Sequence, residues 1–495
     1  MVTNKKSTDS IWSPAVKITV IVAAIVLVLA IALAVVAKMG VFMNNTLAMK
    51  VGDSEVTAQE FNYNYYTAIN AFYTEYYSYF SFYGWDTSKP LTAQTCRLDS
   101  TKTWHEYFVD NTKSELEEVF LLVNAASAQN FQMTEDSAQQ IEDYIKEAEE
   151  AAAKGKVSPD KYLRNIYGKR MTLEKYREFL NHRLLASDFY EAYIDGLTYT
   201  DDELQKYYEE NKTTYDLVNY RYYEVTPENL GSDATDADKE AAKVAAKELA
   251  DKIAAADTEE AFLELVKEDL ISKLKEDEDK DEVDPDEETL QEGQEQSSLD
   301  KEYSEWLLNE DRKAGDTTVV ETEDGEFIVL YFLSVERETY QVSNMRHILL
   351  KVTEEVDDDG TETSDDEEQK KAAENLLKEW EDGEKSEDSF AALVPDNTDD
   401  TASASNGGLY EDITKNYMVE EIDAWLWEEG RKAGDCEIVK TDYGYHIVYF
   451  VGYGDEKWSH DVTNAMQERD YKAQLEQYKA TYSVEYFDRG ISLVG

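Results

Sequence analysis

Basic residues are scarce in this chain of 495 residues. Lys and Arg together number 49 against 107 Asp and Glu, which gives a formal net charge of −58. A surface this acidic repels nucleic acid and other polyanions, and it favours solubility and basic partners. We therefore do not expect the protein to bind nucleic acid.

Cysteine and histidine are also rare. The two cysteines, Cys96 and Cys436, lie far apart in the sequence without a spacing typical of metal or redox sites. We expect unpaired thiols, with a disulfide as the alternative. Five histidines are present, and no Cys/His cluster completes a set of zinc ligands. The sequence therefore predicts no zinc site.

Only one long apolar run occurs, at residues 18–37. About twenty uncharged residues at a rise of 1.5 Å span a hydrocarbon core of about 30 Å. Lys5, Lys6 and Lys17 precede the run and an acidic chain follows it, so the bulk of the protein is expected outside the cytoplasm. The alternative is a signal peptide cleaved after 35–37, but the run is longer than such peptides usually carry. We favour an uncleaved anchor, and no cysteine follows the run to support a lipid anchor.

The next region, 43–213, predicts a small hairpin at 47–56 followed by five to six helices. Its first helix is crowded with Tyr and Phe, residues that pack cores and also suit adaptable contacts with other proteins. Later helices begin at serine or threonine caps, one of them followed by proline, at Thr134, Ser158, Thr172 and Thr200. At the other end of the chain, 462–479 predicts a helix and 482–487 a strand.

An internal repeat follows the helical region. Residues 219–222 (Asn-Tyr-Arg-Tyr) match 344–347 (Asn-Met-Arg-His), and the sequence Arg-Lys-Ala-Gly-Asp ends at both Asp316 and Asp435. Residues 320–329 likewise mirror 439–448. The chain therefore contains two copies of one module, here called the first copy (214–340) and the second copy (341–454).

The repeat also predicts how the copies differ. In the first copy Tyr222 replaces His347, and Phe327 replaces His446. Each copy carries an acidic tract, at 276–295 and 354–368, which we expect to form a solvated, disordered loop.

Four motifs of the second copy occur in a characteristic order. A strand with His347 is followed by a Gly-Gly-Leu turn at 407–409, a helix carrying Met418 and Ile422, and a last strand beginning Gly-Tyr-His-Ile at Gly444. This order resembles the parvulin-type peptidyl-prolyl isomerases. The resemblance implies an antiparallel sheet flanked by helices and an isomerase that requires no cofactor. Parvulins directed to phosphoserine-proline carry a basic cluster where 354–368 is acidic, so we do not expect that specificity.

The resemblance also implies the site residues. His347 and His446 lie on adjacent strands and share hydrogen bonds with Thr441, while Asp400 faces the prolyl amide, with Asp399 as the alternative. The substrate-binding residues are expected to be Leu409, Met418, Ile422 and Tyr443. Leu409, Met418 and Ile422 would form the floor under the proline ring, although the family usually has phenylalanine where Ile422 stands. The alternatives are that these three form ordinary core and that the histidines are structural.

The helical region resembles the N-terminal domain of SurA-like and PrsA-like chaperones. We expect an α+β protein with a tail and transmembrane anchor (1–42), a helical chaperone domain (43–213), a degenerate parvulin-like domain (214–340) and a parvulin domain (341–454). Residues 455–495 either complete the helical domain or form an independent amphipathic tail. The first copy, without histidines, is expected to act as a scaffold or client-binding surface.

The resulting hypothesis is a membrane-anchored extracytoplasmic foldase. It would bind unfolded or proline-containing secreted polypeptides and isomerise their prolyl bonds, and a homodimer is compatible with the sequence. The alternative is a holdase or assembly scaffold that binds clients without catalysis.

Overall fold

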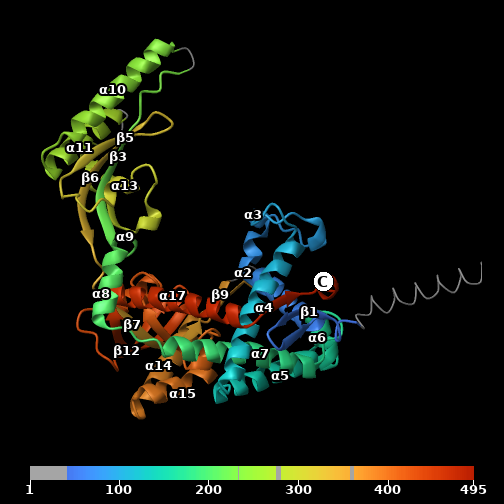
Figure 1. Cartoon of the computed structure of the whole chain (residues 1–495). Helices are drawn as coiled ribbons and strands as arrows, with labels where there is room; N and C mark the ends of the chain where they lie inside the picture. The colour runs from blue at the N-terminus through green and yellow to red at the C-terminus, as the bar shows by residue number, and fades with distance from the viewer. Residues whose placement is uncertain (1–41, 232–233, 275–279, 357–361) are drawn as a thin grey trace, which may run out of the picture. The chain divides into compact units, whose positions relative to one another are not determined.

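The computed structural model describes residues 42–231, 234–274, 280–356 and 362–495. The chain divides into two compact units, one formed by residues up to Thr198 together with Gln467–Gly495, the other by Tyr199–Met466. Both units combine helices with antiparallel sheets, as the predicted α+β class requires (Figure 1). The apolar run at 18–37 lies outside the described residues, and within them no helix is long and apolar enough to span a bilayer.

The first unit is mainly helical and is closed by the C-terminal segment. Its small sheet has the order β13-β1-β2, in which Met49 of the first hairpin pairs with Tyr486 near the C-terminus. The elements are β1 (Leu47–Val51), β2 (Ser54–Thr57), α2 (Ala58–Tyr76), η1 (Tyr77–Tyr79), α3 (Phe80–Tyr83), η2 (Leu91–Ala93), α4 (Trp104–Ala128), α5 (Glu135–Lys154), α6 (Pro159–Tyr167), α7 (Leu173–Asp195), β13 (Val484–Tyr486) and α18 (Asp488–Ile491). The helix α17 (Lys457–Thr481) begins in the second unit and belongs to the first from Gln467 onward.

Aromatic rings dominate the core of this unit. Trp104, fully buried, packs against Phe72, Trp85 and Phe108 at ring separations of 5.2 to 5.8 Å. The predicted aromatic helix ends earlier than its composition suggested, because α2 stops at Tyr76. The rings beyond that point divide between core and surface, and the exposed ones are Tyr77, Tyr79 and Phe82.

The second unit contains the two copies of the repeated module. After α8 (Asp201–Glu210) and α9 (Lys212–Tyr215), the first copy folds into a four-stranded sheet of order β4-β3-β6-β5. Its elements are β3 (Leu217–Val225), α10 (Asp236–Ala254), α11 (Glu259–Lys273), η3 (Lys280–Glu282), α12 (Pro285–Thr289), β4 (Leu290–Gln294), η4 (Gln296–Ser298), α13 (Ser304–Leu307), β5 (Thr317–Glu321) and β6 (Phe327–Glu336).

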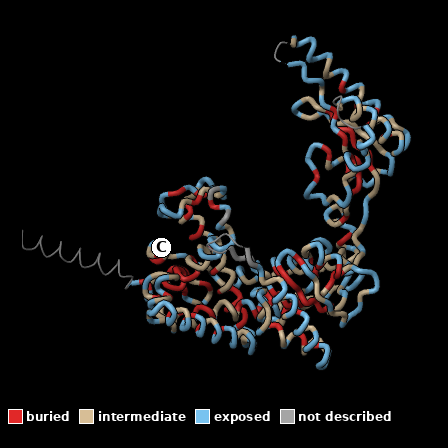
Figure 2. The backbone as a smooth tube through the Cα atoms, turned by 180° about the vertical axis from the view of Figure 1, so that it is seen from behind, coloured by how far each residue is buried: buried red, intermediate tan, exposed pale blue. Residues whose placement is uncertain are grey.

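The second copy has the same topology, with the order β10-β7-β12-β11. In both sheets most residues of the two inner strands are buried, and Figure 2 marks the buried residues of the chain in red. The elements of the second copy are β7 (Gln341–Lys351), β8 (Glu354–Val356), β9 (Glu362–Ser364), α14 (Asp366–Asp382), α15 (Glu387–Asn397), η5 (Ala404–Asn406), β10 (Leu409–Ile413), α16 (Glu420–Leu426), β11 (Cys436–Thr441) and β12 (Gly444–Glu456).

Side-chain contacts repeat along with the topology. Arg221 Nε donates to Glu259 at the start of α11 over 2.8 Å, and Arg346 Nε donates to Glu387 at the start of α15 over 2.9 Å. The guanidinium of Arg312 stacks on the Trp306 ring, as that of Arg431 does on Trp425. The internal repeat predicted from sequence is therefore confirmed in three dimensions.

The strand register corrects one residue of the sequence comparison. Tyr222 pairs with Leu330, and its counterpart His347 pairs with Val448. Counting two residues back along β6 and β12 places Ile328, not Phe327, at the position of His446. The β5–β6 hairpin is one residue longer than the β11–β12 hairpin, and a shift of one residue moves a strand side chain to the opposite face. Phe327 accordingly packs in the core cluster beneath α10 and α11.

The two acidic tracts are more ordered than predicted. In the first, 285–294 forms α12 and the edge strand β4, which pairs with β3. In the second, β8 and β9 form a short hairpin before α14 begins at Asp366. Pairing of backbone groups with a neighbouring strand overrides the polar composition, while 275–279 and 357–361 lie outside the described residues.

The sheet of the second copy has a separate apolar cluster on each of its two faces. Ile348, Leu350, Tyr445, Ile447 and Tyr449 face α14 and α15 in one apolar cluster. The alternate residues Met345, Val448 and Phe450 face α16 in another. Because strand side chains alternate between faces, His347 and His446 lie on the α16 face.

Candidate active site

The pairing of β7 with β12 brings the two histidines together. His347 lies opposite Val448 and His446 lies opposite Leu349, so the histidines are diagonal neighbours on one face. Their Nδ1 atoms are 3.2 Å apart and their rings stack with centroids 5.3 Å apart. Both residues are buried.

A continuous chain of hydrogen bonds passes through this pair. Thr441 Oγ1 lies 3.0 Å from His446 Nε2, and His347 Nε2 lies 2.8 Å from Asp400 Oδ2. Thr441 is the last residue of β11 and is buried. The backbone N–H of Tyr443 donates to the Thr441 hydroxyl over 3.1 Å. The structure thus joins all four predicted polar residues.

The chemistry of the groups fixes the direction of each proton. Burial raises the pKa of Asp400, but hydrogen bonds from Ser403, His347 and Tyr410 outweigh it and hold the pKa well below its usual range. An ionised carboxylate only accepts hydrogen bonds, so His347 donates from Nε2 and accepts at Nδ1. His446 must then donate from Nδ1 and accept the Thr441 hydroxyl proton at Nε2.

The imidazoles are neutral at physiological pH. Burial lowers the pKa of His446 to about 4, with a further contribution from the proximity of His347. Burial also lowers the pKa of His347, against the opposing hydrogen bond and charge of Asp400. The site therefore has a single negative charge, on Asp400, at the end of an oriented hydrogen-bond chain.

The geometry distinguishes Asp400 from Asp399. Asp399 Oδ2 accepts the backbone N–H of Lys351 over 2.8 Å and lies on the outside of the module. Its own N–H donates to the Leu349 carbonyl, and Thr398 Oγ1 accepts the N–H groups of Leu349 and Asp400. These bonds fasten the loop to β7 and direct only Asp400 to the histidines.

Two contributors to the site escaped sequence reasoning. Tyr410 donates from its hydroxyl to Asp400 over 3.0 Å, and its ring lies edge-on to His347 with centroids 5.2 Å apart. The buried Ser403 also donates its hydroxyl to Asp400. The only signal in the sequence was their position. Tyr410 directly follows the Gly-Gly-Leu turn, and Ser403 comes three residues after Asp400.

Register overturns the prediction for Leu409. On the edge strand β10, Leu409 pairs with Arg346 and Tyr410 pairs with Met345. Directly opposed residues share a face, so Leu409 lies on the Arg346 side and Tyr410 lies on the histidine side. Tyr410, rather than Leu409, belongs to the predicted apolar floor.

The other three predicted substrate-binding residues, Met418, Ile422 and Tyr443, lie in different surroundings from one another. Ile422 is buried in α16, while Met418 precedes that helix, so the expected shared helix face is wrong. Both nevertheless pack in the cluster formed by Met345, Val448 and their neighbours. Tyr443, in the β11–β12 turn, is 57 % exposed beside Thr441.

The Gly-Gly-Leu turn is explained by a close approach of two backbones. Gly408 has φ +74°, and a Cβ there would lie 2.3 Å from the His347 carbonyl oxygen. The His347 N–H donates to the Gly408 carbonyl over 2.9 Å. Only glycine allows this contact, which holds His347 in place.

Metal ligands do not gather in the described part of the chain: no group of three or more His, Cys, Asp or Glu is arranged to hold an ion there. Cys96 and Cys436 are free thiols, and burial raises the pKa of Cys436 to about 12.

Comparison with known proteins places this geometry in a family. Residues 347–452 match the model of the PPIC-type PPIase (rotamase) domain. The foldase protein PrsA of Exiguobacterium sibiricum is 31 % identical over 91 residues, covering 18 % of this chain and 29 % of the relative. The chain thus matches less than a third of that foldase's length.

Solved structures of similar proteins give weaker likenesses. PrsA of Bacillus anthracis is 18 % identical, covering 29 % of this chain and 61 % of its own, with a TM-score of 0.19. PrsA of Bacillus cereus is 15 % identical, with coverage of 64 % and 89 % and a TM-score of 0.20. A SurA-like chaperone of Campylobacter jejuni is 13 % identical, with coverage of 59 % and 82 % and a TM-score of 0.16.

Scores this low do not show a common arrangement of whole chains, so the assignment rests on the matched domain. The part of the chain that carries His347, Asp400, Thr441 and His446 belongs to the PPIC-type, or parvulin, family of peptidyl-prolyl isomerase domains.

Proposed function

We propose that the protein is a foldase whose second copy catalyses prolyl cis/trans isomerisation in unfolded polypeptides. The observation that carries this is the buried chain from Thr441 through His446 and His347 to Asp400, beside an apolar surface. Amide resonance sets a rotational barrier of about 18 to 20 kcal/mol. Lowering it requires binding that favours the twisted amide and needs no nucleophile.

Each part of the site has a physical role in this proposal. Tyr410, Met418 and Ile422 form the apolar surface against which a proline ring packs. The planar amide places partial negative charge on its carbonyl oxygen, and a nearby Asp400 carboxylate disfavours that charge. The twisted transition state has less charge there, so the carboxylate lowers the barrier. The two neutral histidines and Thr441 hold Asp400 and the pocket in one orientation.

The remaining parts of the chain fit a chaperone that presents clients to this site. We propose the limits 43–213 for the chaperone domain, completed by the C-terminal segment, and 214–340 for the non-catalytic copy. Exposed rings of the first unit, namely Tyr73, Tyr77, Tyr79 and Phe82, offer contacts for unfolded polypeptide. Residues 18–37 would tether the protein to the membrane with the bulk of the chain outside the cytoplasm.

The test is isomerisation of a short X-Pro peptide by the full chain, followed by NMR exchange or protease coupling. We expect acceleration that falls at least about tenfold in His446→Gln and in Asp400→Ala. Asp399→Asn is the matched control and should retain activity, because its side-chain oxygen still accepts the Lys351 N–H and only Asp400 contacts His347. A folded chain without acceleration would support the holdase alternative instead.

A further inference from the structure

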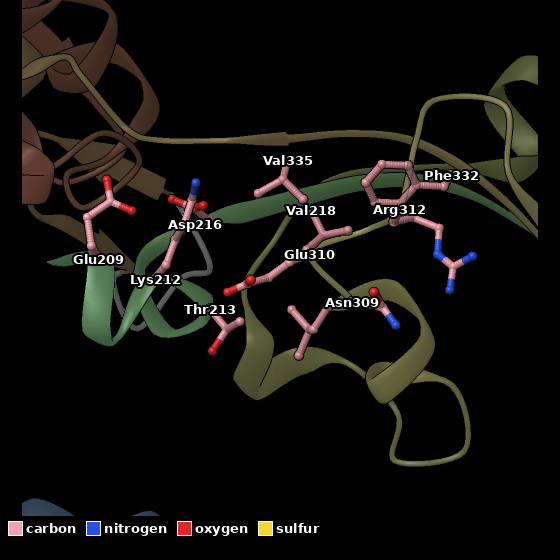
Figure 3. Close-up of a pocket in the computed structure, with 11 residues that line it drawn as sticks. Glu209, Lys212, Thr213, Asp216, Val218, Asn309, Glu310, Arg312, Phe332 and Val335 are labelled. Atoms are coloured by element: carbon pink, nitrogen blue, oxygen red, sulfur yellow. The ribbon is translucent and has the colours of Figure 1, made fainter.

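A pocket lies at the end of the sheet of the first copy, next to α8 and α9 and away from the positions of the histidines. It has a volume of about 430 Å³, within the range of small-ligand sites. Val218, Leu308, Phe332 and Val335 form its apolar part. Figure 3 shows polar residues of α8 and α9 towards one end, among them Glu209 and Lys212, and Asn309 and Arg312 towards the other.

The repeat identifies the counterparts of these residues in the second copy. The stacked pairs Arg312–Trp306 and Arg431–Trp425 make Leu308 equivalent to Trp427. Val335 pairs with Val218 as Tyr453 pairs with Ser343, after the same bulge, so Val335 is equivalent to Tyr453.

In the second copy the corresponding space is filled by the chain's own aromatic rings. Trp427 stacks on Tyr453 with centroids 6.0 Å apart, and Tyr340 meets Trp427 edge-on at 5.4 Å. Tyr453 also lies 4.8 Å from Phe450, the counterpart of Phe332. Trp427 donates its indole N–H to Asp423 over 3.2 Å.

The first copy lacks all three rings at this place. Leu308 and Val335 are shorter than the Trp427 and Tyr453 they replace. Tyr215, the counterpart of Tyr340, packs instead in a cluster with Tyr208 and Trp458. Their absence leaves Phe332 at the base of a cavity, with Val335 42 % exposed at its edge.

We propose that this pocket binds an aromatic side chain of an unfolded client segment, taking the place that Trp427 and Tyr453 occupy in the second copy. The carboxylates of Glu209 and Glu310 at the rim can accept an indole N–H or a phenol O–H. Acidic side chains outnumber basic ones in the lining, so segments with acidic residues beside the ring bind less well. The inference rests on the client-binding part of the proposed function and not on catalysis.

The experiment compares two capped peptides, Gly-Ser-Trp-Ser-Gly and Gly-Ser-Ala-Ser-Gly, titrated into the full chain by NMR or calorimetry. We expect the Trp peptide to bind at least roughly tenfold more tightly, as for a buried aromatic anchor. Leu308→Trp and Val335→Tyr should each fill the pocket and weaken its binding at least roughly tenfold. Leu308→Ile is the matched control and should bind as the native chain does.

Equal binding of the two peptides, or undiminished binding by both filled variants in their folded form, would overturn the proposal. So would a dimer of the native chain that Leu308→Trp dissociates in sedimentation, because the occupant would then be a second copy of the chain. The outcome is separable from catalysis. Leu308→Trp should isomerise X-Pro peptides at the native rate, and His446→Gln should bind the Trp peptide unchanged.

Discussion

The two copies share one sheet topology and differ in what they place on the face opposite their long helices. The second copy places two buried histidines, a buried threonine and a partly buried carboxylate there, all joined by hydrogen bonds. The first has Ile328 in an apolar cluster and Tyr222 at its edge. Buried polar groups are costly unless they are paired, so the second copy keeps its network only because every member has a partner. The difference shows that one fold supports either chemistry or plain packing.

The largest expected effect is a difference in the loss of stability when one glycine of each copy is replaced by alanine. Gly408→Ala should destabilise the second copy by about 3 kcal/mol or more, because the new Cβ meets the His347 backbone. Gly293→Ala, in the edge strand of the first copy, should cost only about 1 to 2 kcal/mol, because φ of +64° strains a residue with a Cβ but no neighbouring atom clashes with it. Hydrogen exchange of β7 and β3 amides measures each copy separately. Equal losses of protection would contradict the close approach.

Acidification should weaken the second copy selectively. The folded pKa of His446, about 4, lies below its unfolded value of about 6.5, and that of His347 is lowered too. Between these values the unfolded state binds more protons, so stability falls as pH falls. The expected loss is on the order of 2 kcal/mol from pH 6.5 to pH 5 for His446 alone.

The first copy has no histidine, so its amides should keep their protection over the same interval. Exchange rates converted to opening free energies at the two pH values provide the measurement. His446→Gln should remove most of the dependence in the second copy, and a chain whose copies lose stability in parallel would disprove the assignment.

The paired arginines provide a smaller contrast. Arg221 is almost fully buried and bonds Glu259, Asp286 and Thr289, whereas Arg346 is more exposed and bonds Glu387 and two backbone carbonyls. Arg221→Ala should therefore destabilise its copy by about 2 kcal/mol and Arg346→Ala by about 1 kcal/mol. The same exchange measurement resolves them. A larger loss for Arg346→Ala would reverse the comparison.

The smallest effect tests the end of the hydrogen-bond chain. Thr441→Val keeps the branched shape and removes the proton donated to His446, so we expect isomerase activity to fall about fivefold. Thr322→Val is the matched control at the equivalent turn of the first copy, where the hydroxyl accepts only the Glu326 N–H. Activity of the full chain on an X-Pro peptide should be unchanged by this control. A similar fall in activity in both variants would show that the Thr441 hydroxyl has no specific role in the site.

Sequence reasoning succeeded where the signal is local or repeated. Cap residues marked the starts of α5, α6, α7 and α8, because a side-chain oxygen must satisfy helix-start amides. The repeat and the motif order identified two copies of one module, the second of them a parvulin domain confirmed by the family match. The roles of the site residues remain predictions.

Tertiary structure decided what depends on register and on contacts distant in sequence. A one-residue difference in hairpin length placed Ile328 rather than Phe327 at the histidine position, and pairing of β10 with β7 placed Tyr410 rather than Leu409 at the site. Composition cannot predict the position of Ile328 or of Tyr410, because each position depends on which backbone groups pair across neighbouring strands. The sequence alone determined which residues the site has to draw on, and the pairing of strands nearly a hundred residues apart decided which of them meet.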